Sequence, residues 1–529
     1  MTAEEWIAHD PDPVTAAELA ACPPDELAAR FAGSLTFGTA GLRGPLRGGP
    51  GGMNLAVVLR ATWALARVLD PPDSAVIVGH DARHGSRRFA VAAAEVLAAE
   101  GFSVTLFPGP VPTPVVAFAV RHIGAAGGVQ ITASHNPASD NGYKVYLAGG
   151  LQIIPPTDHH IETAIAAAPF ADEIARTRVG ASGTEQVQQY VARAAAVRRT
   201  TGSVRVALTP LHGVGGATAV EVLRRAGFED VHTVAAQFDP DPDFPTVAFP
   251  NPEEPGAVDA LLRLAADVDA DIAVALDPDA DRCAIGIPAP GGWRMLSGDE
   301  TGWLLGEYIL SHAATGSVVA STVVSSRMLG AIASEHGARH VETLTGFKWL
   351  ARAAGSELVY AYEEAIGHCV DPTAVRDKDG ISAAVLCCDL VAALSAAGRS
   401  VPGLLDDLAR RHGVHVTTSV TARTEDAGAV MARLRAHPPA RLAGIDVTVT
   451  DLLARRGQLR TDALILSGGD EHTSVRLAVR PSGTEPKIKG YIEIRHAVNG
   501  ELAGARTAAE MLTTAVAAEA ARLLQRGPN

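Results

Sequence analysis

Residues 75–107, AVIVGHDARHGSRRFAVAAAEVLAAEGFSVTLF, have the pattern of a strand, a turn, a helix and a second strand. Apolar runs of strand length open and close the stretch, and the Ala-rich segment between them ends at Gly101, a residue type that commonly follows a helix C-terminus. The same order recurs in residues 204–234 and 318–344. A βαβ unit used three times predicts an α/β protein of three similar mixed α/β domains with mostly parallel sheets.

The last part of the chain has a different pattern, with short apolar runs and one closing helix after about Arg411. A C-terminal α+β domain is therefore expected behind the three α/β domains. At 529 residues the chain is too long for a single core. We expect domains at 1–197, 198–313, 314–411 and 412–529.

The composition is that of a large globular protein. Its formal net charge of -14 argues against a general nucleic-acid surface, although clustered cations can still bind a phosphate locally. No apolar run reaches the ~18 residues needed to span a bilayer, and the start of the chain is acidic rather than basic. Five cysteines without a Cys-x-x-Cys spacing favour buried thiols over a disulfide framework or a zinc site. We expect a cytoplasmic protein with no membrane or nucleic-acid partner.

A candidate nucleophile lies in residues 131–137, ITASHNP. A Gly-rich run precedes this stretch and DNGYK follows it at 140–144, so Ser134 and His135 are expected on a loop built from turn-forming residues. A nucleophile with a base beside it is presented in this way. For the heptapeptide alone, a solvated turn with an incidental serine is an equally good interpretation.

The carboxylates of Asp277, Asp279 and Asp281 follow directly after an apolar run and predict a metal site. Side chains at i, i+2 and i+4 of an extended segment point the same way, so these three can meet one hard cation at the carboxyl end of a strand. Mg²⁺ is the expected ion and Mn²⁺ the alternative. An EF-hand loop is excluded, because Arg282 stands where Gly is required and Pro288 where Glu is required. A solvated Asp/Pro turn is the competing interpretation.

Two further loops contain residue types that bind sugar phosphates. Residues 480–487, RPSGTEPK, combine an Arg, hydroxyls and a Gly that frees backbone N–H groups, and they predict a phosphate cradle, with an ordinary hairpin loop as the alternative. Residues 362–368, YEEAIGH, place paired carboxylates where they can accept hydrogen bonds from sugar hydroxyls, which is the weakest of these patterns. Only five lysines occur in the chain, and four of the five lie in or beside candidate loops; the five are Lys144, Lys348, Lys378, Lys487 and Lys489.

Taken together, several segments resemble the motifs of the α-D-phosphohexomutases in order and spacing. They are FGTAGLRG at 37–44, TASHNP at 132–137, DPDADR at 277–282, TGFK at 345–348, EE at 363–364 and RPSGTEP at 480–486. The chain looks most like the phosphoglucomutase/phosphopentomutase branch, because NGYKVY at 141–146 and FPNPEEPG at 249–256 are similar as well. The family implies four domains around one central cleft and small sugar phosphates as substrates.

The resemblance also implies roles for individual residues. Ser134 is the implied phosphoserine, and its phosphate is implied to hold Mg²⁺ together with Asp277, Asp279 and Asp281. Arg282 is implied to steady the seryl phosphate, and Lys144 is implied to face the moving phosphoryl group. The residues implied for proton transfer or for stabilising charge are His135, Lys348 and Arg43. The implied contacts to the sugar and to its resting phosphate are Gly346, Glu363, Glu364, His368, Arg480, Ser482, Gly483, Thr484 and Lys489.

The implied reaction passes a phosphoryl group from Ser134 to the free hydroxyl of a sugar phosphate, turns the bisphosphate over and returns its other phosphate to the serine. Phosphoryl transfer depends on positioning and charge neutralisation, which a metal and a ring of cations provide. Glucose 1-phosphate to glucose 6-phosphate is the expected conversion, with a sugar bisphosphate as primer. We expect a monomer or a dimer.

One position departs from part of the family. Many hexomutases carry a serine where this chain has Ala365, so one hydroxyl contact is missing; His368 could compensate, or a smaller pentose phosphate could be the substrate. A phosphomannomutase on the same fold is another alternative. A non-catalytic sugar-phosphate binder is a further alternative. A dinucleotide site at 212–216, HGVGG, is disfavoured because Thr218 stands where the third Gly is required, and no Gly-x-Ser-x-Gly surrounds Ser134 to indicate a hydrolase.

Overall fold

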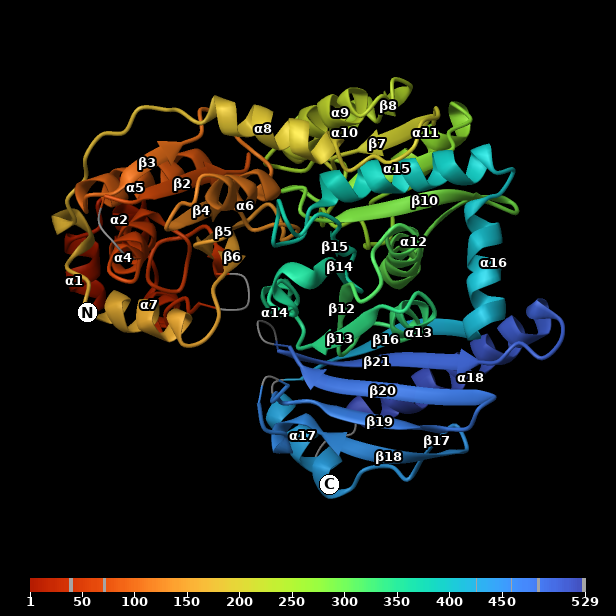
Figure 1. The fold of residues 1–529 in the computed structure, drawn as a ribbon. Coiled ribbons are helices and arrows are strands. Elements are labelled where there is room, and N and C mark those ends of the chain that lie inside the picture. Colours follow the sequence, from red (N-terminus) through yellow and green to blue (C-terminus); the bar gives the residue numbers. More distant parts are fainter. Residues whose placement is uncertain (38–40, 70–72, 425, 458, 483–485, 526–529) are drawn as a thin grey trace. The chain divides into compact units, whose positions relative to one another are not determined.

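The structure of the chain is a computed structural model, in which residues 1–37, 41–69, 73–424, 426–457, 459–482 and 486–525 are described (Figure 1). Internal contacts divide the chain into two units. Unit 1 comprises Met1–Leu296 and Gly367–Ala393, and unit 2 comprises Ser297–Ile366 and Leu394–Asn529.

The first sheet of unit 1 contains β1 (Leu42–Pro45), β2 (Ala75–His80), β3 (Ser103–Leu106), β4 (Gly127–Ile131), β5 (Asp140–Leu147) and β6 (Leu151–Gln152). Its strand order is β1-β5-β4-β2-β3, and β6 pairs with β5. The helices of this part are α1 (Ala3–Ala8), α2 (Pro13–Ala20), α3 (Pro24–Phe31), α4 (Leu55–Ala66), α5 (Ser86–Ala99), α6 (Thr113–His122), α7 (Thr157–Ala166) and α8 (Thr184–Ala195).

The stretch that predicts the fold forms β2, α5 and β3. Val76, Ile77 and Val78 have no exposed surface, because α5 and α6 both pack on β2. β2 pairs in parallel with β3 and with β4. β5 runs antiparallel to β4, because the connection at residues 132–139 is shorter than the roughly dozen residues that a parallel crossover needs.

The second sheet of unit 1 repeats this plan. It contains β7 (Val206–Thr209), β8 (Val231–Thr233), β9 (Ile272–Leu276), β10 (Cys283–Ala289) and β11 (Gly292–Met295), in the order β11-β10-β9-β7-β8. β7 is parallel to β8 and β9, and β10 returns antiparallel after residues 277–282. The helices of this part are α9 (Gly215–Arg225), α10 (Ala235–Phe238), α11 (Asp259–Asp267) and the greater part of α15 (Gly380–Ala396). The strand β15 (Gly367–Cys369) also belongs to unit 1 but is not part of this sheet.

Unit 2 contains the third repeat and the C-terminal sheet. In the repeat, β12 (Val318–Thr322) lies parallel to β13 (Arg339–Thr343) and β14 (Leu358–Glu363). The helices of the repeat are α12 (Gly298–Leu310), α13 (Met328–Glu335), α14 (Phe347–Leu350) and α16 (Val401–His412).

The C-terminal sheet of unit 2 is antiparallel wherever its pairing is described, with the order β16-β21-β20-β19-β18-β17. Its strands are β16 (Val414–Arg423), β17 (Arg441–Leu442), β18 (Ile445–Asp451), β19 (Leu464–Gly469), β20 (Thr473–Pro481) and β21 (Lys487–His496). α18 (Leu502–Gln525) packs on β16 and β21, and α17 (Ala427–Ala436) packs on β20.

The candidate loops occupy matching places in the repeats. Residues 132–139, the serine loop, follow β4, and residues 277–282, the metal loop, follow β9. Each loop leaves the third strand of a parallel group and enters an antiparallel strand. In unit 2, Glu363 ends β14, the corresponding third strand, and Glu364 follows it. The motifs therefore lie at carboxyl ends of strands, where α/β proteins bind ligands.

These elements confirm the predicted fold class, with mixed sheets in which antiparallel strands extend parallel groups. The four domain boundaries and the central cleft stay predictions.

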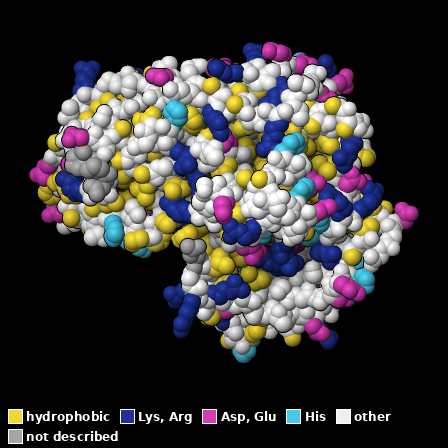
Figure 2. All heavy atoms as spheres, viewed as in Figure 1, with side chains coloured by type: hydrophobic (Ala, Val, Ile, Leu, Met, Phe, Trp, Pro, Cys, Tyr) yellow, Lys and Arg dark blue, Asp and Glu magenta, His cyan; other side chains and the backbone are white. Residues whose placement is uncertain are grey.

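All five cysteines are free, and four of them are buried. Among the described residues, no single helix is long and apolar enough to cross a membrane. The helices α15 and α16, which meet at a sharp bend, are long and apolar enough only when they are counted together, and by length and composition alone. On the face seen in Figure 2, basic and acidic side chains are interspersed.

Candidate active site

Ser134 lies in the serine loop with a φ of 52° and a buried side chain. A non-glycine residue in this left-handed region is strained by roughly 1–2 kcal/mol, so surrounding bonds must hold it. Its amide donates to Thr132 Oγ1 at 2.9 Å, and the Asn136 amide donates to the Ala133 carbonyl at 3.1 Å. These local bonds stabilise the strained turn.

The Ser134 hydroxyl contacts one carboxylate and one imidazole. Its Oγ donates to Asp277 Oδ2 at 2.8 Å and lies 3.3 Å from His135 Nδ1. Burial lowers the pKa of His135 well below its usual value, and the Arg282 and Arg43 guanidiniums lower this pKa further. A neutral imidazole beside the hydroxyl can accept its proton.

The metal loop brings three buried carboxylates together. One oxygen from each of Asp277, Asp279 and Asp281 lies within 4.8 Å of the other two. Asp279 Oδ1 and Asp281 Oδ1 are buried and have no hydrogen-bond partner in the described part of the chain. Buried carboxylate oxygens without partners are unfavourable unless a cation binds them, and Mg²⁺ takes oxygen ligands. The residues present therefore fit a divalent cation.

Two lysines stand beside these carboxylates. Lys144 Nζ, on β5, is 2.6 Å from Asp279 Oδ2 and 2.7 Å from Asp281 Oδ2, and Lys378 Nζ is 3.4 Å from the same Asp281 oxygen. Burial raises the pKa of Asp279, but the Lys144 ammonium outweighs burial and leaves this pKa below its usual value. The pKa of Asp277 is raised well above its usual value by burial and by the two neighbouring carboxylates. A cation bound beside these carboxylates would lower the pKa of Asp277.

Arg43 and Arg282 add guanidiniums to the same site. Arg43 Nη1, on β1, donates to Asn136 Oδ1 at 3.3 Å. The Arg282 amide donates to Asp277 Oδ1 at 3.0 Å, and its Nε lies 3.8 Å from Asp281 Oδ1. A hydroxyl, an imidazole, a carboxylate triad and several cations can together provide the nucleophile, the base and the charge stabilisation that phosphoryl transfer uses.

Residues outside the predicted motifs hold the metal loop. Thr113, at the start of α6, donates its amide to the Asp279 carbonyl at 2.9 Å and its Oγ1 to Asp279 Oδ2 at 2.5 Å. A Cβ at Gly213 would lie 2.4 Å from the Pro278 carbonyl oxygen, so only glycine permits this approach. The HGVGG segment therefore supports the metal loop. The sequence contains no signal for Thr113, and only the rarity of lysine pointed to Lys378.

Unit 2 contains most of the predicted sugar contacts. Gly346, with a φ of 108°, precedes α14, in which the Lys348 side chain is largely buried. Glu364 Oε2 accepts hydrogen bonds from Ser325 Oγ at 2.8 Å and from Thr322 Oγ1 at 3.1 Å. These two bonds orient the carboxylate at the end of β14.

Tyr491, on β21, lies beside both predicted contact groups of unit 2. Burial raises the pKa of its phenol, Glu364 and Glu363 raise it further, and Arg480 opposes them. Arg480 pairs with Lys489 in the β20–β21 register, and Lys489 Nζ lies 5.9 Å from the Tyr491 ring centroid. In unit 2, the paired carboxylates and the cradle arginine therefore act electrostatically on the same phenol.

The remaining predicted substrate contacts that the structure describes lie in the β20–β21 hairpin and in unit 1. The Ser482 amide donates to the Lys487 carbonyl at 2.8 Å and closes the β20–β21 hairpin. Gly483 and Thr484 lie outside the described residues. His368 belongs to unit 1 and is fully buried, and burial lowers its pKa to about 3. Its imidazole is therefore neutral at physiological pH.

Comparison with known proteins identifies a family for most of the chain. Family models described as phosphoglucomutase/phosphomannomutase α/β/α domains I, II and III match residues 34–172, 185–290 and 297–412. A probable phosphomannomutase from Haemophilus influenzae is 38% identical over 463 residues, covering 84% of this chain and 93% of that protein. A phosphopentomutase from Mus musculus is 33% identical over 556 residues, covering 93% and 89%. The fold matches that of a phosphoglucomutase/phosphomannomutase family protein from Burkholderia thailandensis with a TM-score of 0.70 at 22% identity, covering 93% of this chain and 98% of that chain.

Proposed function

The chain belongs to the phosphoglucomutase/phosphomannomutase family of the α-D-phosphohexomutase superfamily. We propose that it interconverts glucose 1-phosphate and glucose 6-phosphate through a phosphoserine at Ser134. As a member of this family it is a mutase, an isomerase that transfers a phosphoryl group within its substrate. The observation that carries the proposal is the 2.8 Å contact of Ser134 Oγ with Asp277, beside carboxylate oxygens that have no hydrogen-bond partner.

Mg²⁺ is the proposed metal, because the family generally depends on it and the triad offers oxygen ligands. Asp277, Asp279 and Asp281 would hold the ion together with the phosphate on Ser134. When bound, Mg²⁺ neutralises charge on the phosphoryl oxygens.

The residues of the chain carry out the reaction in two phosphoryl-transfer steps. Phosphorylated Ser134 gives its phosphoryl group to the free hydroxyl of the sugar, and the proton of that hydroxyl passes to Ser134 Oγ through His135. After the sugar bisphosphate turns over, its other phosphate returns to Ser134 and the proton moves back. The cations that hold the seryl phosphate or stabilise the moving group are Arg282, Arg43, Lys144 and Lys348.

The sugar and its resting phosphate bind outside the serine and metal loops in this proposal. Sugar contacts are assigned to Gly346, Glu363, Glu364 and His368. The resting phosphate is assigned to Arg480, Ser482, Gly483, Thr484 and Lys489. A sugar bisphosphate primes the enzyme by phosphorylating Ser134. We place the enzyme in the cytoplasm as a monomer or a dimer, where its free cysteines stay reduced.

Other sugars are supported by specific observations. Two relatives are named phosphomannomutase and phosphopentomutase, and Ala365 lacks the hydroxyl that many hexomutases place there. A non-catalytic sugar-phosphate binder is a separate candidate. Intact-mass detection of a phosphate on Ser134, followed by assays with four sugar 1-phosphates, tests these functions against one another.

We expect glucose 1-phosphate or a pentose 1-phosphate to exceed mannose 1-phosphate by at least about tenfold in kcat/KM, a gap of ~1.4 kcal/mol that one hydroxyl contact can supply. Steady-state assays with glucose, mannose, ribose and deoxyribose 1-phosphates measure it. Ala365→Ser is the matched variant and should raise the hexose values relative to the pentose values. A mannose preference would contradict the assignment.

Arg480→Ala is expected to lower kcat/KM by roughly 10- to 1000-fold, mainly through KM. The substitution removes one or two charge-assisted hydrogen bonds of ~1.5–3 kcal/mol each to a phosphate that keeps its charge throughout the reaction. Arg480→Lys should recover only part of the loss, because an ammonium cannot reproduce the planar fork.

The control for this prediction is Arg441→Ala, which changes an exposed arginine of the same sheet. It should leave kcat/KM unchanged. If Arg480→Ala behaves like Arg441→Ala in steady-state kinetics, the C-terminal sheet does not hold the substrate phosphate.

A further inference from the structure

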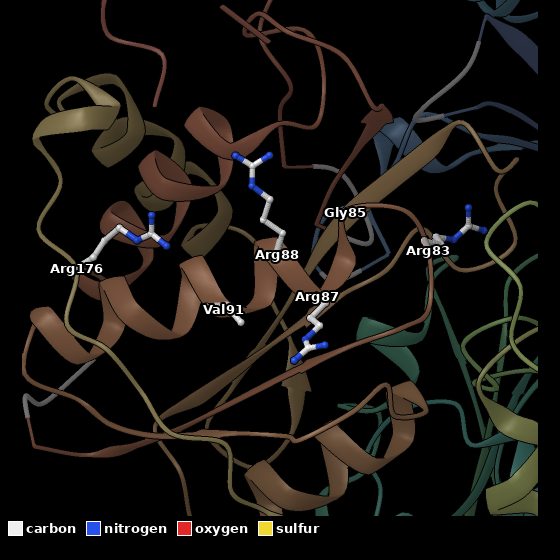
Figure 3. A pocket seen from close by; sticks show the side chains of 6 residues that line it. All are labelled: Arg83, Gly85, Arg87, Arg88, Val91 and Arg176. Carbon is white, nitrogen blue, oxygen red and sulfur yellow. The ribbon is translucent and has the colours of Figure 1, made fainter. Parts of the chain in front are cut away.

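Arg83 is a buried arginine that none of the predicted site motifs includes. It lies in the loop before α5, and its side chain is 1% exposed. Figure 3 shows its guanidinium pointing away from Arg87, Arg88 and Arg176. Arg87 and Arg88 are exposed on α5, whereas Arg83 is directed into the protein.

Arg83 donates hydrogen bonds to four backbone carbonyls in and beside the serine loop. Its Nη2 donates to the Ser134 carbonyl and to the Asn136 carbonyl, both at 2.6 Å. Its Nη1 donates to the Pro137 carbonyl at 2.7 Å and to the Asp140 carbonyl at 3.2 Å. These bonds use all four terminal N–H groups of the guanidinium.

Neighbouring groups hold the guanidinium in this position. Arg83 Nε lies 3.3 Å from Asp81 Oδ2, while Asp81 Oδ1 accepts from the Arg83 amide at 3.0 Å and from Ser86 Oγ at 2.6 Å. Asn141 Nδ2 donates to Ser86 Oγ at 2.9 Å, which ties this group to the start of β5. The Phe244 ring lies against the guanidinium, with Cζ 4.9 Å from its centroid.

The shape of the serine loop requires such a cation. Carbonyl groups that converge on one point repel one another, and those that are buried need donors. Ser134 also has a left-handed backbone conformation, which an unsupported loop would leave. Because Arg83 binds the Ser134 carbonyl itself, it maintains the conformation in which Ser134 Oγ lies 2.8 Å from Asp277.

We propose that Arg83 is a positioning residue that holds the serine loop in the one conformation able to give and receive the phosphoryl group. This inference rests on the proposed function of Ser134. Arg83 acts through backbone carbonyls, so its loss should slow phosphoryl transfer in both directions and leave binding of the sugar phosphate unchanged. A lysine keeps the positive charge but cannot reach four carbonyls from one plane.

The test compares Arg83→Lys with wild type and with Arg87→Lys, a matched substitution on the exposed face of α5. We expect Arg83→Lys to lower kcat by about 30- to 300-fold, because a small displacement of a reacting group costs this much, with KM within about threefold of wild type. The rate at which a sugar bisphosphate phosphorylates Ser134 should fall by the same factor. Arg87→Lys should match wild type in every measurement.

A second measurement does not depend on activity. Amide hydrogen exchange in residues 132–141, without substrate, should become at least about tenfold faster in Arg83→Lys, and exchange in β9 should not change. Asp81→Asn keeps the hydrogen bonds of Asp81 Oδ1 but removes the charge that orients Arg83, so it should show the same effects to a smaller degree. If Arg83→Lys does not fold, kcat and loop exchange in Asp81→Asn test whether Arg83 holds the serine loop.

Several results would overturn the inference. One is that Arg83→Lys folds and keeps kcat within about threefold of wild type, and another is that only its KM changes. A third is that hydrogen exchange of the serine loop is unchanged in both Arg83→Lys and Asp81→Asn. The proposed function fails in a different way. If wild-type protein neither turns over sugar phosphates nor accepts a phosphate on Ser134, the function is wrong, and the exchange measurement still decides whether Arg83 holds the loop.

Discussion

Ser134→Ala should abolish mutase turnover, lowering kcat by at least about 10⁴-fold, while binding of glucose 1-phosphate stays within about threefold of wild type. The reaction relays its phosphoryl group through the serine oxygen, and no other side chain of the serine loop provides a hydroxyl at 2.8 Å from Asp277. Loss of a covalent nucleophile typically costs a factor of this size or larger. The substrate contacts assigned to other residues are untouched.

The measurement combines steady-state kinetics, calorimetric binding and intact mass after incubation with a sugar bisphosphate. Ser139→Ala is the matched control, because Ser139 is an exposed serine of the same loop and its hydroxyl donates only to Asp140 Oδ1. That variant should be phosphorylated and active. Turnover that persists in Ser134→Ala would contradict the phosphoserine mechanism, as would a phosphate found on another residue during turnover.

Asp279→Asn should weaken Mg²⁺ binding by at least about tenfold, because a hard cation prefers charged oxygen. It should also lower kcat by roughly 100- to 1000-fold, because the charge on the moving phosphoryl group loses its counter-ion. Asp279 Oδ1 is buried without a hydrogen-bond partner, which makes it available as a ligand. Its other oxygen forms the 2.6 Å contact with Lys144. The substitution therefore also loosens the lysine that is assigned to the transferred group.

Titration of activity and of calorimetric heat with Mg²⁺ measures this effect, and Asp239→Asn, at an exposed aspartate of unit 1, is the control. Wild-type activity should disappear on exhaustive chelation and return when Mg²⁺ is added. Activity that survives chelation would show that the triad is not a required metal site. Equal Mg²⁺ dependence in Asp279→Asn and wild type would assign the ion to other residues.

Much of the fold could be predicted from local patterns. The strand, turn and helix of residues 75–107 appear as β2, α5 and β3, because apolar runs of strand length and a glycine after the helix are properties of neighbouring residues. The motif loops were predicted for the same reason, since turn-forming residues after an apolar run indicate the end of a strand. The directions of β5 and β10 depend on short connections, whose length is visible only once the strand ends are known.

The composition of the site was decided by tertiary packing. Ser134 and Asp277 are 143 residues apart in the chain, and Thr113 and Asp279 are 166 residues apart, yet each pair is joined by a hydrogen bond. Arg83 looks in the sequence like one more polar residue of a turn, and its four carbonyl partners appear only when that turn packs beneath the serine loop. Residue patterns along the chain report which segment is a strand, a helix or a loop. Contacts between distant side chains depend on how those segments pack in three dimensions, and this packing alone brought Arg83, Thr113 and Lys378 to the predicted site.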